Sequence, residues 1–364
     1  MRIFNKITQE LFTNFACIKN VSDKDKKHND NYFMLLAKRI EVLKGLKDWW
    51  ALDDQEWQDT KQKAYLHNQW FIPGFLDHRI HCITNQFLDE EKLDYWTRHY
   101  HLDDNVSSRN IGIVMAGNIP LVGFHDFLAV FVSGHKAVIK LSEKDEVLMR
   151  KVVDKMIALD PDVKEYIMFA EMLKGCDAYI ATGSNNTSRY FDYYFGKYPS
   201  IIRRNRTSAA VLTGTESHDE LALLADDVFL YFGLGCRNVS QIYVPEGYDF
   251  VPLLDAFRKY EYLKDHAKYR NNYDYNLALL IMNSRAYMCN ENIILVEGDQ
   301  LFSPISELYF SYYKDPGAGA EALLHNEQVQ CVAGKGYIPM GQTQQAGLFD
   351  YADGVDVMEF LLSV

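Results

Sequence analysis

Short apolar segments that run into small-residue turns and then into helical patterns constrain the fold of this chain more than any other feature. Residues 110–120 form a strand pattern that ends in the turn of residues 117–120. Residues 134–140 form a second strand pattern before a helix with Ser142 as an N-cap candidate, and residues 178–184 form a third that runs into a helix start at residues 185–189. Strands that alternate with helices pair in parallel, because each helix returns the chain to the same edge of the sheet. The sequence therefore predicts an α/β fold with a parallel sheet, whose small residues lie at the strand ends where such sheets bind phosphates.

The second half of the chain repeats the alternation of strands and helices. Strand patterns over residues 209–212, 241–244 and 293–296 are separated by helical patterns that include residues 219–232 and 252–260. This half therefore predicts a second α/β lobe, and a cleft between two lobes is the usual place for an active site.

We divide the chain into three parts on this basis. A helical lead-in and a nucleotide-binding domain occupy residues 1–205, a catalytic domain occupies residues 206–345, and a tail covers residues 346–364. Residues 1–100 contain all five tryptophans and read as helical. We expect this lead-in to pack on the main body, and we assign it no chemistry.

Composition and charge exclude several classes of protein. The 364 residues carry a formal net charge of −12, whereas nucleic-acid binding needs a basic face that meets phosphates. The six cysteines are scattered singly and without the spacing of a zinc site, so we expect neither a metal nor disulfides. No window approaches about 18 apolar residues and no leader pattern opens the chain, so we expect a cytoplasmic protein without a membrane span.

One cysteine stands in a setting that suits a nucleophile. Cys236 follows an apolar run and the residues Gly233-Leu234-Gly235, so little side-chain cover precedes it and its own N–H can approach a ligand closely. Those are the needs of a nucleophile whose amide helps to hold an oxyanion. Arg237 is placed to lower the pKa of the thiol and to raise its thiolate fraction. The alternative is that Cys236 is a small buried apolar residue, as most free cysteines are.

Asn118 is the second candidate for the reaction itself. It lies in the tight turn that follows the first predicted strand. A side-chain amide in such a turn can donate a hydrogen bond to a developing oxyanion. Considered alone, a turn asparagine that bonds its own backbone is the simpler interpretation.

Two further motifs follow predicted strands and suit a dinucleotide. Lys140, Ser142 and Glu143 come after the second strand, where an acidic group can accept from a ribose hydroxyl or can simply open a surface helix. Gly183 and Ser184 end the third strand, just before a helix whose dipole could seat a pyrophosphate. Neither motif is a complete dinucleotide fingerprint, so each is weak by itself.

Taken together and in order, these motifs resemble the aldehyde dehydrogenase superfamily over roughly residues 105–364. They are most similar to its acyl-CoA reductase branch, the family of the fatty acid reductase component of bacterial luminescence. The phrase of residues 233–239 and the tail of residues 351–356 point to that branch. The motifs that carry the resemblance are Gly117-Asn118-Ile119-Pro120 for the oxyanion turn, Lys140-Leu141-Ser142-Glu143 for Lys-Pro-Ser-Glu, Thr182-Gly183-Ser184 for Thr-Gly-Ser, Gly235-Cys236 for the nucleophile loop, and Asp299-Gln300-Leu301-Phe302-Ser303-Pro304 for Glu-Glu-Ile-Phe-Gly-Pro.

The resemblance implies two Rossmann-like parallel-sheet lobes with the active site between them. It implies catalytic roles for Cys236 and Asn118, an acyl-CoA substrate and at least a dimer, with an acyl-transfer partner as a further option. The luminescence family implies NADPH, whereas Glu143 would repel a 2′-phosphate and favour NADH. The residues that the resemblance assigns to the cofactor are Lys140, Ser142, Glu143, Gly183, Ser184, Gln300 and Phe302.

Two departures from the superfamily pattern bear on the reaction. Members that hydrolyse their thioester carry a glutamate in a Glu-Leu-Gly-Gly motif, and the position aligned with that glutamate is Ile202. Gln300 stands where the superfamily has the second glutamate of Glu-Glu-Ile-Phe-Gly-Pro. Without a general base water is not activated, so an acyl-enzyme survives until it is reduced. Arg203 and Arg204 could meet phosphates of CoA or of the dinucleotide, but ordinary surface arginines are the simpler expectation.

The predicted activity is therefore NAD(P)H-dependent reduction of a long-chain acyl-CoA to the aldehyde, through a thioacyl-enzyme on Cys236. One alternative is the reduction of another thioester or of an acyl phosphate. Another is an acyl-accepting subunit of a fatty acid reductase complex. A chain that binds nucleotide without catalysis is disfavoured, because Cys236 and Asn118 are both present.

Overall fold

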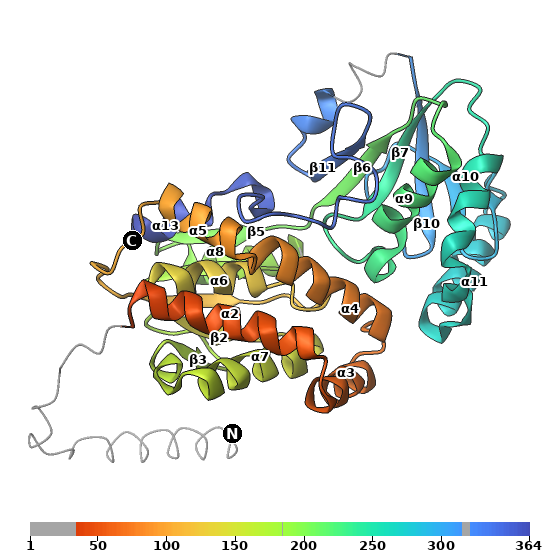
Figure 1. Ribbon diagram of the computed structural model, residues 1–364. Helices are drawn as coiled ribbons and strands as arrows, with labels where there is room; N and C mark the ends of the chain where they lie inside the picture. The colour runs from red at the N-terminus through yellow and green to blue at the C-terminus, as the bar shows by residue number, and fades with distance from the viewer. Residues whose placement is uncertain (1–33, 184, 315–320) are drawn as a thin grey trace, which may run out of the picture. The chain divides into compact units, whose positions relative to one another are not determined.

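The computed structural model describes residues 34–183, 185–314 and 321–364, and its elements are labelled in Figure 1. Residues from Leu35 onward form one compact unit. Within the described residues, the strands gather into one sheet of five strands and one of six. The α/β class predicted from the sequence is therefore confirmed.

The first sheet is parallel throughout and has the strand order β3-β2-β1-β4-β5. The order reverses between β1 and β4, which creates the crevice at the carboxyl ends of strands where doubly wound sheets hold their ligands. The predicted strands after residues 110, 134 and 178 are all present. The strands of this sheet are β1 (Asn110–Val114), β2 (Lys136–Lys140), β3 (Ile167–Phe169), β4 (Ala178–Thr182) and β5 (Ser200–Arg203).

The helix that follows β1 is the most deeply buried element of this half. In α6 (Phe124–Ser133) every residue except His125 is buried. Most of this helix is apolar, as expected for a helix on which both α2 (Leu36–Leu52) and α13 (Val357–Leu362) pack (Figure 1). The remaining helical segments of this half are η2 (Glu143–Asp145), α7 (Glu146–Leu159), η3 (Pro161–Glu165), α8 (Asn185–Phe195) and η6 (Ala352–Gly354).

The tryptophan-rich lead-in packs on the main body, as predicted. The rings of Trp49 and Trp57 lie 5.2 Å apart between their centroids, and the ring of Trp50 lies 5.9 Å from that of Phe124 in α6. These aromatic contacts bury large apolar surfaces of the lead-in against the first sheet's helices. The described helices of the lead-in are α2, α3 (Gln55–His67), α4 (Pro73–Cys82), the π-helical turn η1 (Ile83–Phe87) and α5 (Glu90–His99).

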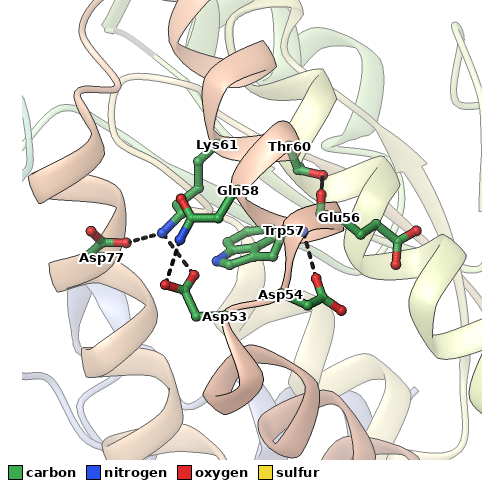
Figure 2. Close-up of polar contacts among 8 residues, drawn as sticks. All are labelled: Asp53, Asp54, Glu56, Trp57, Gln58, Thr60, Lys61 and Asp77. Carbon is green, nitrogen blue, oxygen red and sulfur yellow. Dashed lines mark hydrogen bonds and ion pairs between the residues drawn. The ribbon is translucent and has the colours of Figure 1, made fainter.

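A buried lysine fixes the directions of these helices relative to one another (Figure 2). Lys61 of α3 is 5% exposed, and its Nζ lies 3.0 Å from Asp53 Oδ1 and 2.7 Å from Asp77 Oδ1. Asp53 ends α2 in a left-handed conformation with φ of 43°, and Asp77 lies on α4. A buried ammonium that lost its carboxylates would be left uncompensated, so Lys61 ties α2, α3 and α4 together.

The second sheet has the order β11-β6-β7-β10-β9-β8 and is parallel except for the edge pair β8 and β9. Its core is formed by residues of α9, β7, α10 and η5. The domain boundary predicted between residues 205 and 206 lies in the connection from β5 to β6, and the division itself stays a prediction. The elements are β6 (Thr207–Val211), α9 (His218–Phe229), η4 (Leu230–Gly233), β7 (Val239–Pro245), α10 (Val251–Ala256), η5 (Phe257–Asp265), α11 (Ala267–Met282), β8 (Met288–Cys289), β9 (Ile294–Glu297), β10 (Glu307–Tyr313) and β11 (Val329–Gly334).

Two helices end earlier than the sequence predicts. The helix predicted over residues 219–232 ends at Phe229, because Tyr231 and Phe232 take left-handed conformations with φ of 54° and 58°. The helix predicted over residues 252–260 ends at Ala256 and continues as the 3₁₀ segment η5. Strands β3, β5, β8, β10 and β11 are additional to the prediction. β3 and β8 are too short to give a pattern, and the other three show neither a clean apolar run nor a strict alternation.

Candidate active site

The candidate nucleophile lies in a tight turn between η4 and β7. Cys236 and Arg237 occupy the two central positions of this turn, which the Asn238 N–H closes by donating to Gly235 O at 3.1 Å. The Asn238 side chain is 1% exposed; its Oδ1 accepts from the Gly235 N–H at 2.8 Å and its Nδ2 donates to Leu230 O at 2.8 Å. Asn238 therefore builds the loop that presents Cys236. Sequence analysis gave it no such role, although an asparagine two residues after the cysteine was the available signal.

The residues that deliver the cysteine loop are conformationally strained. Tyr231 and Phe232 both have positive φ, which costs bulky residues of the order of 1 kcal/mol or more each. Packing holds them in place, because the Phe232 ring lies 4.8 Å from Trp70 and 5.0 Å from Phe75, and the Tyr231 hydroxyl lies 2.8 Å from His78 Nδ1. The lead-in thus supports a strained segment directly before the nucleophile, and such strain is commonly concentrated at functional sites.

The structure brings Asn118 to the cysteine loop. Asn118 lies in the turn between β1 and α6, and its Nδ2 donates to Leu234 O at 2.6 Å. The turn asparagine therefore bonds the loop that carries Cys236, where sequence analysis had left open a bond to its own backbone. A primary amide has two N–H groups, so one of them is still available to a ligand.

Charged groups from three parts of the chain surround the thiol. Burial is the largest influence and raises the pKa of Cys236, Arg237 and Arg203 oppose this increase, and Asp353 adds to it. Arg237 acts in the predicted direction, because its positive charge lowers the pKa of the thiol, but burial has the larger effect and the pKa is raised on balance. Arg237 also donates from Nη2 to Asp350 O at 2.9 Å, which ties the tail to the cysteine loop.

The segment at the end of β5 differs from the expected pair of surface arginines. Arg203 is 6% exposed, and its Nη1 lies 2.5 Å from Asp126 Oδ2 of the buried helix α6. A guanidinium is stable there because its carboxylate partner is buried beside it. Arg204 is an exposed arginine, as expected, with its Nη2 3.5 Å from Asp192. The surface interpretation is therefore wrong for Arg203.

A second thiol lies next to the cysteine loop and was not singled out from the sequence. The Ser208 hydroxyl donates to Cys236 O at 3.1 Å and lies 3.1 Å from the Sγ of Cys331 in β11. The neighbouring Gln330 accepts from the Asp353 N–H at 3.2 Å, and the Asp353 carboxylate lies 3.1 Å from Arg206 Nε. Only tertiary pairing of β11 with β6 brings these residues together, so no local sequence signal could have identified them.

The carboxyl ends of β1, β2 and β4 meet at the crevice of the first sheet, and the residues there fit a dinucleotide. A Cβ on Gly183 would lie 2.8 Å from the Phe191 ring, so α8 packs closely on the end of β4 with its N-terminus at this edge. Lys140 and Glu143 are both exposed at the end of β2, and Ser142 caps η2 by accepting from the Lys144 N–H at 3.3 Å. Backbone N–H groups, a lysine and an accepting carboxylate are the groups that a pyrophosphate and a ribose require. Ser184 lies outside the described residues.

The last two predicted cofactor residues lie in the second sheet's half. Gln300 is exposed and Phe302 is half-buried, and both line a cavity of about 510 Å³ together with Tyr243 and Asn326. Cys236 does not line this cavity. Leu301 O nevertheless accepts from the hydroxyl of Ser240 at the start of β7. The segment that carries Gln300 and Phe302 therefore contacts the strand that directly follows the cysteine loop.

Within the described residues, no three His, Cys, Asp or Glu side chains are grouped to hold a metal ion. In the same part of the chain, no helix combines the length and the apolar character that a membrane crossing requires. The cysteines that the structure describes, Cys82, Cys176, Cys236, Cys289 and Cys331, are all free thiols.

No family model matches this sequence, and no curated protein matches it. Solved structures match its fold over most of its length. An oxidoreductase from Marinobacter aquaeolei is 12% identical, with a TM-score of 0.58 over 83% of this chain and 74% of its own. An NAD-dependent aldehyde dehydrogenase from Sinorhizobium meliloti is 11% identical, with a TM-score of 0.58 over 82% of this chain and 70% of its own. An aldehyde dehydrogenase from Bacillus cereus in complex with NAD⁺ is 11% identical, with a TM-score of 0.57 over 82% and 72%.

The chain has an aldehyde dehydrogenase-like fold. This confirms the fold predicted from the order of the motifs. Likeness at this level of identity establishes the fold alone, because one fold serves many activities. Within the aldehyde dehydrogenase-like fold, Asn118 and the Cys236 loop meet, whereas Lys140, Glu143 and Gly183 gather at the crevice of the first sheet.

Proposed function

We propose that this chain is a nicotinamide-dependent reductase that converts a long-chain acyl-CoA to the aldehyde through a thioacyl intermediate on Cys236. One observation carries the proposal: where the superfamily's hydrolytic members have a general base, this chain has Ile202 and then the buried Arg203–Asp126 ion pair. A guanidinium bound to a carboxylate cannot accept a proton from water. The site therefore favours a reaction whose acyl-enzyme is reduced and not hydrolysed.

A carboxylate does approach the thiol from the tail, and its surroundings limit what it can do. Asp353 is bound by Arg206 Nε at 3.1 Å, and the backbone N–H of Arg204 also bonds its carboxylate. Both donors lower the pKa of the Asp353 carboxyl and so weaken it as a base for water, whereas burial raises that pKa. Asp353 accordingly supports the tail's attachment more than it supports hydrolysis.

The chain's own groups are sufficient for acyl transfer. Cys236 Sγ attacks the thioester carbon, the C–S bond to CoA breaks, and the departing thiolate takes the thiol's proton, so no separate acid is consumed. The negative charge that develops on the acyl oxygen is stabilised by the second Asn118 N–H and by the Cys236 N–H. Loss of one such donor typically lowers kcat by about 10²–10³-fold.

The proposed cofactor is NADPH, with NADH as the alternative. Lys140, Ser142, Glu143 and the N-terminus of α8 beyond Gly183 would hold its ribose and pyrophosphate, with Gln300 and Phe302 closer to the nicotinamide. Hydride transfer to a carbonyl carbon is the chemistry that a reduced nicotinamide supplies when it is bound. The neighbours' names support a nicotinamide cofactor, since they include NAD-dependent and NAD⁺-bound enzymes. We further propose a homo-oligomer in the cytoplasm.

The proposal is tested by intact-protein mass spectrometry of the purified chain mixed with palmitoyl-CoA. One acyl adduct is expected on the wild type and none on Cys236→Ala, since that thiol is the acceptor. Cys331→Ala is the matched control, because it removes the neighbouring thiol and should keep the adduct. No adduct with palmitoyl-CoA, with acetyl-CoA or with an acyl phosphate would overturn the proposal. An adduct that persists after addition of both NADPH and NADH would favour an acyl-accepting subunit instead.

A further inference from the structure

The turn that carries Asn118 is held by groups to which the proposed reaction gives no role. Leu121, three residues further on, has φ of 49°, which is unfavourable for a branched side chain. A backbone conformation of that kind persists only where the surroundings determine it. The contacts around Pro120 and Leu121 identify what determines it here.

Two side chains from different elements form hydrogen bonds with the backbone of this turn. Asp145, at the end of η2, accepts from the Leu121 N–H through Oδ2 at 2.6 Å and is 6% exposed. Arg79 of α4 donates from Nε to Pro120 O and from Nη2 to Leu121 O, each at 3.2 Å. One N–H and two carbonyls in succession are thereby fixed, and the rigid fork of the guanidinium suits two adjacent acceptors.

Contacts of the lead-in in turn hold the segments that carry Arg79 and Asp145. Asp77, two residues before Arg79, is bound by the buried Lys61 at 2.7 Å (Figure 2). On the other side, Asn68 Nδ2 donates to Lys144 O at 3.2 Å, next to Asp145. The lead-in, to which sequence analysis gave no chemistry, therefore supports both sides of the Asn118 turn.

We propose that Arg79 and Asp145 are positioning residues for Asn118, which hold the Pro120–Leu121 backbone so that the Asn118 amide stays beside the Cys236 loop. This inference rests on the proposed function, because it gives the turn a role in stabilising the oxyanion. Asn118 Nδ2 reaches Leu234 O at 2.6 Å only while the turn keeps its position. A shift of the turn by about 1 Å would misalign the second N–H and cost of the order of 10²-fold in rate.

The test is a double-mutant cycle on acyl-CoA reduction with Arg79→Gln, Asn118→Ala and the double variant. Arg79→Gln should lower kcat at least ~10-fold with little change in KM. The interaction that it weakens is the hydrogen bond from Asn118 to the oxyanion, which is made only in the transition state. In the Asn118→Ala background the same substitution should change kcat less than ~2-fold, since its effect passes through Asn118. Arg150→Gln is the matched control, as Arg150 is an exposed arginine of α7 that pairs with Glu146.

A structural role alone would give a different result. Equal losses from Arg79→Gln in both backgrounds would overturn the inference while leaving the proposed function intact. A wild type that makes no aldehyde from any acyl-CoA would instead defeat the proposed function. The positioning claim is then tested by hydrogen exchange of the peptide spanning residues 117–122. Arg79→Gln should speed exchange of the Leu121 N–H at least ~10-fold while Arg150→Gln does not, and unchanged exchange in Arg79→Gln would overturn the inference.

Discussion

At the scale of single residues, burial affects the candidate nucleophile Cys236 more than the positive charges beside it do. Burial raises the pKa of Cys236, and the flanking Arg237 and Arg203 only partly oppose it. We therefore expect the protonated thiol to predominate in the resting state and the reactive thiolate to increase as pH rises. A protonated resting thiol suits a reaction that returns a thiolate leaving group, because the proton moves between the two sulfurs.

We predict that the rate at which iodoacetamide alkylates Cys236 rises with pH to a midpoint above that of an ordinary cysteine. Asp353 raises this pKa by its negative charge, so Asp353→Asn should move the midpoint to lower pH. Arg237→Gln should move it to higher pH, because a favourable positive charge is removed. Alkylation quenched at successive times and quantified on the Cys236 peptide by mass spectrometry separates its signal from that of the exposed Cys289 and the other thiols. A midpoint below that of free cysteine, or the same shift in both variants, would contradict this account.

At the scale of elements, the turn after β1 and the loop after β2 act as one unit because they touch at both ends. Leu121 bonds Asp145 at one end, and at the other a Cβ on Gly117 would lie 2.6 Å from Ser142 Oγ. The turn that carries Asn118 and the loop that carries Ser142 and Glu143 are therefore set by the same two contacts. A change in either should affect both acyl chemistry and cofactor binding.

Gly117→Ala is predicted to destabilise the fold by about 1–3 kcal/mol, because the added methyl would overlap both Oγ and Cβ of Ser142. Gly74→Ala is the matched control: an added Cβ there meets nothing within 4 Å, and Gly74 lies in the first turn of α4. Alanine at that helical position should be neutral or should stabilise by up to about 1 kcal/mol. Urea unfolding of both variants measures the difference, and equal stabilities would contradict the close packing of this unit.

The order of elements could be predicted from the sequence, whereas their ends and long-range contacts could not. The strand-turn-helix units around residues 110, 134 and 178 are local patterns of apolar and small residues, and each is present in the structure. The helix end at Phe229 depends on Tyr231 and Phe232 being held in left-handed conformations by Trp70 and Phe75, which are distant in the chain. No propensity of the local sequence contains that information.

The residues of the candidate site could likewise be predicted only where the signal was local. Cys236 and Asn118 were identified because each sits in a turn with a local glycine signal, and the structure brings their loops into contact. The Arg203–Asp126 pair, Cys331 and Arg79 were not identified, because each reaches the site from a separate element. Contacts between elements far apart in sequence are what a single sequence leaves undetermined.

At the scale of the whole molecule, one histidine joins the lead-in, the first sheet's half and the tail. The ring of His125 in α6 is stacked between Phe87, at 4.6 Å, and Tyr351, at 5.3 Å, and its Nε2 lies 3.1 Å from Leu348 O. Tyr351 also accepts from Trp96 Nε1 at 2.9 Å. The tail therefore closes over α6 through an aromatic stack that covers both faces of the half-buried imidazole.

Burial in that stack lowers the pKa of His125 to about 4, whereas an unfolded chain has a value near 6.5. Because the folded state binds this proton less readily than the unfolded state, His125 stabilises the fold above about pH 6.5, and this is lost as pH falls towards 4. The contribution is of the order of 3 kcal/mol. His125→Gln keeps a donor for Leu348 and should flatten this part of the pH dependence. Parallel stability curves for the wild type and His125→Gln between pH 4 and 7 would refute the assignment.

The central claim is that acyl groups on Cys236 leave by reduction and not by hydrolysis, and a single-turnover measurement on the acyl-enzyme tests it most directly. The palmitoylated protein is freed of excess palmitoyl-CoA, NADPH is added, and aldehyde and free acid are both quantified. The account predicts one equivalent of aldehyde per adduct, exceeding free acid at least ~10-fold, because no general base activates water at Ile202. Release mainly as free acid, with or without NADPH, would contradict it.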